Sequence, residues 1–227
     1  MSKIDKKNRF YYDSSFLGSS SGRSLRILSE YYGPLQRLER NNVSETIVFF
    51  GSARIPSKKD AELALQNHSD KKDLQTIAKL KMDVKMSRYY EEARELANKF
   101  TVWSKSLKDS KHRYIICSGG GPGIMEAANR GASEANGVNV GLTISLPFES
   151  SENEWISDDL SMKFHYFFMR KFWFLYLAKG LVVWPGGFGT LDELMELLTL
   201  IQTRKIKKPL PIVLYGKEFW ENVVNWD

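Results

Sequence analysis

A glycine-rich turn between a buried strand and a helix constrains the fold of this chain more than any other feature. Residues 181–184 form a short, continuous apolar run of the kind found in central parallel strands. The next nine residues read Pro-Gly-Gly-Phe-Gly-Thr-Leu-Asp-Glu, and apolar residues then recur at helical spacing over 191–201. Glycines let a backbone approach a ligand closely, and the free N–H groups at a helix start favour an anion. The pattern therefore predicts a phosphate-binding turn, built from Gly186, Gly187, Gly189 and Thr190.

Two side chains of this turn allow two interpretations. Thr190 could offer its hydroxyl to a phosphate, and Glu193 places a carboxylate within one helical turn of the same point. The same pair also satisfies the capping-box pattern, in which both side chains only bind the first N–H groups of the helix. Taken alone, Glu193 fits either a catalytic or a purely structural role.

Two further strand-to-helix turns are expected. Residues 113–117 read as a strand and 124–135 as a helix, with Ser118 and Gly119, Gly120, Gly121, Pro122 and Gly123 between them. Residues 46–50 form another β-rich run, which breaks at Gly51 and Ser52. The carboxyl ends of parallel strands meet at one edge of the sheet, and ligands bind there. A nucleotide is the ligand that these loops predict.

Dinucleotides and P-loop substrates fit less well. The third glycine of the dinucleotide fingerprint would fall at position 124, which is Ile124, and the strand predicted over 138–146 ends without an acidic residue for a ribose hydroxyl. No Lys-Ser or Lys-Thr pair follows either glycine turn at the P-loop offset. A mononucleotide fits these turns better as a ligand.

Four motifs in this order resemble the LONELY GUY (LOG) family. They are the Gly51-Ser52-Ala53-Arg54 turn, the 119–123 turn with Met125, Met169-Arg170-Lys171, and the 185–193 segment. The family consists of Rossmann-like nucleoside 5'-monophosphate phosphoribohydrolases that release cytokinin bases, and many members carry a "lysine decarboxylase" label. The resemblance covers about residues 43–217.

The resemblance implies roles only where residues correspond. Arg170 and Glu193 match the catalytic pair, and the glycine turns together with Thr190 match the phosphate site. Gly51, Ser52, Met125 and Lys171 join them as expected substrate-binding residues. Met125 is followed by Glu126 rather than the glycine of the short plant proteins, so the chain looks more like the longer bacterial type.

The residue chemistry agrees with this assignment. Breaking the bond between ribose C1′ and a base nitrogen builds positive charge on the sugar. A carboxylate such as Glu193 can either stabilise this charge or orient the attacking water. The planar fork of Arg170 suits a phosphate or ribose hydroxyls, although a surface arginine on a helix is the alternative. Lys171 could equally face solvent.

Residues 164–178 are expected to form one helix that is apolar nearly all round. Such a helix is either a central core helix or a subunit interface, and the resemblance implies a homodimer. Arg170, Lys171 and Lys179 interrupt the run, and no apolar stretch approaches the length of a membrane span.

Composition agrees with a soluble, cytoplasmic enzyme, and the alternation of strands and helices predicts an α/β fold with a parallel sheet, which the resemblance implies is Rossmann-like and doubly wound. The chain has 227 residues, 42% hydrophobic content and a net charge of +6, with 33 basic and 27 acidic residues spread along it, so nucleic-acid binding is not expected. We expect a tail and docking helix over 1–42 and a catalytic domain over 43–227, with further chain beyond it, because the family continues past this point. Cys117 is the only cysteine, and His68, His112 and His165 are scattered, so no metal and no cofactor are expected.

The predicted function is hydrolysis of a nucleoside 5'-monophosphate, AMP or an N6-substituted AMP of the cytokinin type, to free base and ribose 5-phosphate. A molybdenum-cofactor or nucleotide carrier on the same scaffold is the main alternative, although a carrier would not need both Arg170 and Glu193. A lysine decarboxylase would need a lysine bound to pyridoxal phosphate, and neither Lys171 nor Lys179 has such a setting. The sequence leaves the base undetermined.

Overall fold

A six-stranded, fully parallel sheet forms the centre of the molecule. The computed structural model describes residues 9–68, 73–108, 113–145 and 152–225. The strand order is β4-β3-β2-β1-β5-β6, and every neighbouring pair is parallel. The strands are β1 (Thr46–Phe50), β2 (Ile115–Ser118), β3 (Asn139–Ile144), β4 (Ser161–Phe164), β5 (Ala178–Val183) and β6 (Ile212–Leu214). The expected α/β class with a Rossmann-like parallel sheet is confirmed.

The chain reverses its direction of winding between β1 and β5. From β1 it moves outward to β2, β3 and β4, then returns to the other side of β1 as β5 and continues to β6. The loops that leave β1 and β5 are joined by a hydrogen bond from the N–H of Ser52 to the carbonyl of Pro185, at 3.0 Å. Such a switch point opens a crevice at the carboxyl ends of the strands.

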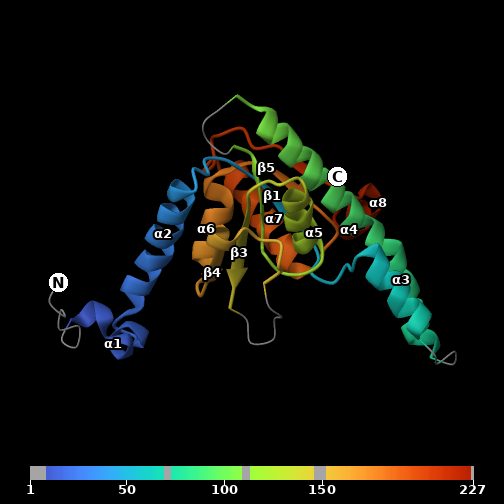
Figure 1. The fold of residues 1–227 in the computed structure, drawn as a ribbon, viewed down its shortest axis with the longest axis horizontal. Coiled ribbons are helices and arrows are strands. Elements are labelled where there is room, and N and C mark those ends of the chain that lie inside the picture. Colours follow the sequence, from blue (N-terminus) through green and yellow to red (C-terminus); the bar gives the residue numbers. More distant parts are fainter. Residues whose placement is uncertain (1–8, 69–72, 109–112, 146–151, 226–227) are drawn as a thin grey trace.

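Helices cover both faces of the sheet (Figure 1). Their bounds are α1 (Ser14–Gly18), α2 (Arg23–Arg40), α3 (Lys58–Asn67), α4 (Leu74–Ser106), α5 (Ile124–Glu134), α6 (Phe167–Tyr176), α7 (Phe188–Gln202) and α8 (Lys217–Val223). Two short 3-10 helices complete the order, η2 (Phe10–Tyr12) and η3 (Asp158–Leu160). Helices α2, α6 and α7 pack on one face of the sheet, and α4 and α5 pack on the other.

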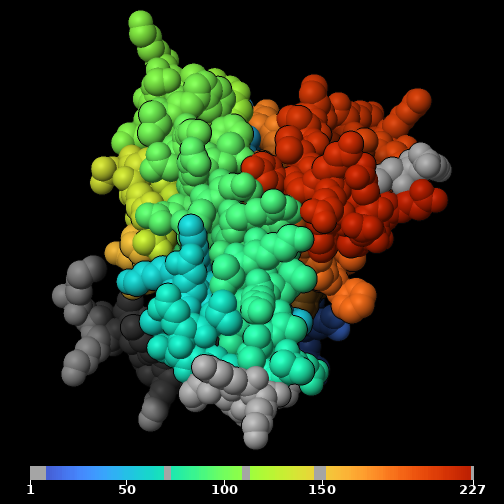
Figure 2. All heavy atoms as spheres, turned by 90° about the vertical axis from the view of Figure 1, so that its right-hand side faces the viewer, coloured from blue at the N-terminus to red at the C-terminus, as the bar shows by residue number. Residues whose placement is uncertain are grey.

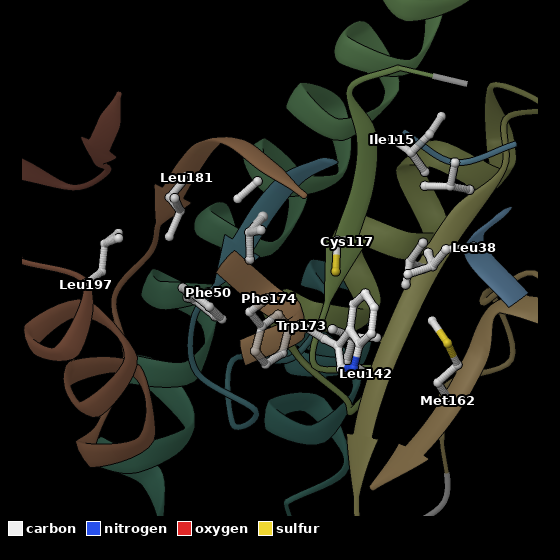
Figure 3. Packing of buried hydrophobic residues seen from close by; sticks show 14 of the residues in the cluster. Leu38, Phe50, Ile115, Cys117, Leu142, Met162, Trp173, Phe174, Leu181 and Leu197 are labelled. Carbon is white, nitrogen blue, oxygen red and sulfur yellow. The ribbon is translucent and has the colours of Figure 1, made fainter. Parts of the chain in front are cut away.

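Alternating side chains divide the strands between two cores. On β1, Val48 and Phe50 point to the α6 side, whereas Ile47 and Phe49 point to the α4 side. Figure 3 shows the first of these cores, where Phe50 lies against Phe174 of α6 with ring centroids 4.9 Å apart. Strands buried on both faces explain why the sequence shows continuous apolar runs here rather than alternation.

The α4–α5 contact is unusually close. A Cβ added at Gly131 would lie 2.0 Å from the carbonyl oxygen of Arg94, and Ala93, Ala97 and Ala128 are fully buried around it. Figure 2 shows the outer face of this layer, with α3 and α4 in cyan and green beside the C-terminal segment in red. Tyr89 of α4 meets that segment through Tyr215, with ring centroids 6.3 Å apart.

The structure corrects the single helix expected over 164–178. Phe164 ends β4, the helix α6 spans only Phe167–Tyr176, and Ala178 opens β5. Periodicity within an apolar run does not show where a buried strand ends and a buried helix begins, because both elements have apolar side chains on all faces.

The N-terminal segment also differs from expectation. Residues 1–8 lie outside the described residues, but η2 and α1 follow where a loosely held tail was expected. The side chain of Asp13 accepts from the N–H groups of Ser15 and Phe16, which gives α1 a cap. Helix α2 lies where the docking helix was expected.

Candidate active site

A cavity of about 580 Å³ opens at the switch point of the sheet. Its walls are the turns after β1, β2 and β5 together with one side of α6 and the start of α7. Ten of the predicted site residues line it: Gly51, Ser52, Gly119, Gly121, Met125, Arg170, Gly187, Gly189, Thr190 and Glu193. The three loops that were expected to converge do so.

The turn before α7 leaves space that the fold itself does not require. A Cβ at Gly187 or Gly189 would meet nothing within 4 Å, and neither residue has a positive φ. Gly186 differs, because a Cβ there would lie 2.2 Å from the hydroxyl oxygen of Thr190. Gly186 is therefore needed for packing, whereas Gly187 and Gly189 leave open space beside the cavity.

Helix α7 begins three residues earlier than expected. Its N-cap is Gly187, which supplies no side-chain cap, and Thr190 and Glu193 lie inside the helix. The capping-box interpretation of this pair is therefore wrong. The first N–H groups of α7 are available to a ligand in the cavity.

The second glycine turn is shaped by its contacts. Gly120 and Gly123 have φ of +70°, and a Cβ at Gly123 would lie 2.4 Å from the carbonyl oxygen of Ser52. A Cβ at Gly119 or Gly121 would meet Met125, at 2.6 and 2.9 Å. Gly120 turns away from the cavity, since its added Cβ would meet Thr143 at 2.4 Å.

A buried network of polar side chains supports this turn from below. The hydroxyl of Ser118 donates to Asn129 and accepts from the N–H of Gly120, at 2.6 and 3.0 Å. Asn153 donates to the carbonyl of Gly121 at 3.0 Å and to Asn129 at 3.0 Å, and Asn129 donates to Asn139 at 2.8 Å. Satisfied buried networks of this kind fix one backbone conformation.

Arg170 projects from α6 into the cavity between two rings of its own helix. Its guanidinium carbon lies 5.1 Å from the ring centroid of Phe167 and 5.7 Å from that of Phe174. One guanidinium nitrogen lies 3.8 Å from a carboxylate oxygen of Glu193. The structure thus brings the two expected catalytic residues together across the α6–α7 boundary.

Glu193 is a buried carboxyl group with a perturbed proton affinity. Its side chain is 7% exposed, and its Oε1 accepts no hydrogen bond from the described residues. Burial raises its pKa from 4.5 to about 7, against the opposing effect of Arg170 and Lys171. A carboxyl group with a pKa near neutrality can exchange protons at the pH of a cell.

Lys171 points away from the cavity and joins α6 to α7. Its ammonium lies 2.8 Å from Asp192 and 2.6 Å from Glu196, on either side of Glu193 along the helix. Burial alone would lower the pKa of Lys171, but the bonds to Asp192 and Glu196 outweigh it and raise that pKa. Glu196, considered as a second carboxylate, is thereby an ion-pair partner.

Six residues that line the cavity were not among the site residues predicted from the sequence. They are Phe50, Ala53, Arg54, Phe174, Phe188 and Leu191. Arg54 belongs to a motif that the sequence analysis used, and it adds a cation to the cavity. Phe188 is 92% exposed in the structure. Its position between Gly187 and Gly189 is the only sequence signal that could have identified it as a site residue.

The described residues contain neither a cluster of metal ligands nor a membrane-spanning helix. In these ranges no group of three or more His, Cys, Asp or Glu side chains is placed to hold a metal, and His112 lies outside them. Cys117 is buried, and burial raises the pKa of its thiol. No described helix is both long and apolar enough to span a bilayer.

Part of the chain is similar in sequence to curated nucleosidases. A pyrimidine/purine nucleotide 5'-monophosphate nucleosidase of Escherichia coli K12 is 31% identical over a match that covers 44% of this chain and 24% of that protein. The counterpart from Escherichia coli O157:H7 matches equally. The chain thus spans about a quarter of the length of the curated relatives it matches.

Solved structures and a family model give the remaining matches. The molybdenum cofactor carrier protein of Chlamydomonas reinhardtii has a TM-score of 0.37 at 20% identity, over 74% of this chain and 75% of its own. The X-ray structure of TM1055 has a TM-score of 0.38 at 22% identity, over 69% of each chain. Neither likeness bears on function.

The family model described as "Possible lysine decarboxylase" matches residues 125–227. The matched segment contains Arg170 and Glu193, and the match supports the resemblance to the LOG family that the four motifs indicated.

Proposed function

We propose that this chain hydrolyses the N-glycosidic bond of a nucleoside 5'-monophosphate. Water adds to C1′ of the ribose, the bond from C1′ to the base nitrogen breaks, and the products are the free base and ribose 5-phosphate. The observation that carries the proposal is the juxtaposition, in one cavity, of an uncapped helix start with the Arg170–Glu193 pair.

The phosphate fits the start of α7. Gly187 and Gly189 leave open space at this point, and the positive end of the helix dipole favours an anion there. The start of α5 lines the same cavity through Met125, and Gly123 at its N-cap supplies no side-chain cap. Arg54 and Arg170 add two cations to the walls.

Glu193 acts at the sugar. As a carboxylate it stabilises positive charge that develops at C1′, or it accepts a proton from the attacking water. Arg170 lines the cavity with a guanidinium nitrogen 3.8 Å from Glu193, and its planar fork suits ribose or phosphate oxygens. General acid–base help of this kind is worth about 10²–10⁴-fold in rate.

AMP and N6-substituted AMP are the substrates we propose to test first. The curated relative is named for both pyrimidine and purine nucleotides, and Met125, Phe174 and Phe188 add apolar surface to the walls of the cavity. Such walls accept the faces of any base, so GMP and CMP belong in the same panel.

We also propose that two copies of the chain associate through α6. Phe167, Phe168, Phe172 and Tyr176 are between 38% and 50% exposed on this helix, beside Tyr32 of α2 at 61%. Exposed aromatic groups gathered on one face are typical of interfaces. A second copy would cover them.

The test is release of base and ribose 5-phosphate from AMP, N6-isopentenyl-AMP, GMP, CMP and adenosine, followed by chromatography. We expect release from at least one monophosphate and a rate from adenosine that is lower by several orders of magnitude, because the donors meant for phosphate would be left unpaired. Glu193→Gln and Arg170→Ala should abolish turnover.

Glu134→Gln is the matched control, because Glu134 is an ion-paired carboxylate at the far end of α5. It should retain wild-type turnover. Nucleotide binding without release from any substrate would refute hydrolysis and favour the carrier alternative.

A further inference from the structure

Helix α6, which carries Arg170, starts without a cap of its own. Its N-cap residue is Tyr166, whose side chain makes no capping hydrogen bond. The first N–H groups of any helix have no partner inside the helix, and an acceptor from elsewhere in the chain can satisfy them.

A residue of α2, more than 130 residues earlier in the chain, binds the N-cap of α6 and the residue before it. The carboxylate of Glu30 accepts from the N–H of His165 at 2.7 Å and from the N–H of Tyr166 at 3.2 Å. The backbone carbonyl of Glu30 also accepts from the indole N–H of Trp173 at 2.9 Å. One residue of α2 therefore holds α6 at its start and again two turns later.

A carboxylate is well suited to this position. The start of a helix carries partial positive charge, and an anion there makes charge-assisted hydrogen bonds that are stronger than neutral ones. Glu30 thus restrains both the axial position and the rotation of α6 about its own axis.

The restraint reaches the cavity through α6. Arg170 lies one turn beyond the capped N–H groups and extends to Glu193, while Lys171 bonds Asp192 and Glu196. A small rotation of α6 would move the guanidinium of Arg170 relative to the carboxylate, whereas the ion pairs of Lys171 tolerate such a shift better because two acceptors share one ammonium.

We propose that Glu30 is a positioning residue for Arg170, so that the N-terminal helix forms part of the working site. The role rests on the function proposed above. It assigns to α2, which lies outside the family match at residues 125–227, a task beyond covering the sheet.

Other contacts keep α2 docked when Glu30 changes. Arg37 donates to the carbonyl of Ser161 at 2.9 Å, and Arg40 pairs with Asp159. Tyr31 packs on Phe172 and Trp173, with ring centroids 5.6 and 5.9 Å apart. A variant at Glu30 is therefore expected to fold.

The experiment compares Glu30→Ala, Glu30→Gln and the control Glu39→Ala, which alters an exposed acid on the same helix. Hydrogen–deuterium exchange of residues 165–171 reports the cap, and kcat and KM for AMP report the site. We expect Glu30→Ala to speed exchange of this segment roughly tenfold and to lower kcat about 10- to 100-fold, with a smaller change in KM.

Glu30→Gln keeps a carbonyl acceptor and should recover a large part of both losses, and Glu39→Ala should match the wild type. Unchanged exchange over 165–171 in Glu30→Ala would overturn the proposal. Faster exchange along the whole chain with equal damage in the Ala and Gln variants would also overturn it, because that result describes general destabilisation.

Failure of the proposed function gives a different result. The wild-type chain would then release no base from any monophosphate, and kcat would report nothing. The exchange data, together with the affinity for AMP measured by calorimetry, would still judge Glu30: local loss of protection with weaker binding supports its role, and wild-type values of both refute it.

Discussion

Replacing Glu193 by glutamine should abolish activity and yet stabilise the fold above neutral pH. The carboxyl group is 7% exposed, and the guanidinium of Arg170 lies 3.8 Å from it. Burial raises its pKa from 4.5 to about 7, even though Arg170 and Lys171 oppose the shift. Ionised Glu193 therefore lowers the free energy of unfolding, because burial disfavours its charge. Glutamine cannot ionise, so the substitution removes this destabilisation.

The size and sign of the effect follow from the two pKa values. Below about pH 4.5 the carboxyl is protonated in both folded and unfolded chains, so it contributes nothing to the pH dependence. As the pH rises from 4.5 to about 7, only the unfolded state releases the proton, and the free energy of unfolding falls. At about 1.36 kcal/mol per pKa unit, the full loss is about 3 kcal/mol above pH 7.

Urea denaturation followed by tryptophan fluorescence, at pH 5 and at pH 8.5, measures this difference. We expect Glu193→Gln to raise the free energy of unfolding by up to about 3 kcal/mol at pH 8.5 and by much less at pH 5. Equal stability of variant and wild type at pH 8.5, or an equal gain at both pH values, would refute the burial argument.

Glu134→Gln is a control of opposite sign. Burial alone would raise the pKa of Glu134, but hydrogen bonds from Arg94 and Arg130 outweigh it and hold that pKa below 4.5. A lowered pKa stabilises the fold above the unfolded value, and the contribution is lost as the pH falls through the folded one. Glu134→Gln should therefore weaken the fold at pH 8.5.

Two further predictions concern backbone space and assembly. Gly123→Ala should lower the free energy of unfolding by at least about 2 kcal/mol, because φ is +70° and the new Cβ would meet the backbone of Ser52. Gly187→Ala should keep the wild-type Tm and raise the KM for AMP, because the new methyl group fills only open space. Differential scanning calorimetry and kinetics separate the two, and a lowered Tm in Gly187→Ala would contradict this account. Sedimentation should give a dimer for the wild type and a monomer for Tyr176→Arg, with Val102→Arg on exposed α4 as the control; a monomeric wild type would refute the interface.

The fold was predictable where the sequence marks both ends of an element. The strand expected over 46–50 is β1 residue for residue, since Gly51 and Ser52 end it and four of its five side chains are apolar. The start of α5 was equally clear after five turn-forming residues. The segment 164–178 has no such marks inside it, so the change from β4 to α6 to β5 was invisible in a run of aromatic residues.

The candidate site was predictable in its loops and less so in its supports. Glycine turns are local patterns, and the meeting of three of them follows from the parallel sheet. The role of Thr190 and Glu193 depended on where α7 begins, which the capping pattern misplaced by three residues. Glu30 and Asn153 act over long sequence distances through backbone groups, and such contacts leave no pattern in a single sequence.

The close approach of α4 and α5 bears on how this cavity could change during evolution. No larger side chain fits at Gly131, so α5 and the turn before it form a wall that substitution can hardly reshape. The opposite wall is permissive, because Gly187 and Gly189 border open space and Phe188 touches little of the chain. Substitutions that change which ligand the cavity accepts should therefore arise on the α7 side, while the α5 side keeps its shape.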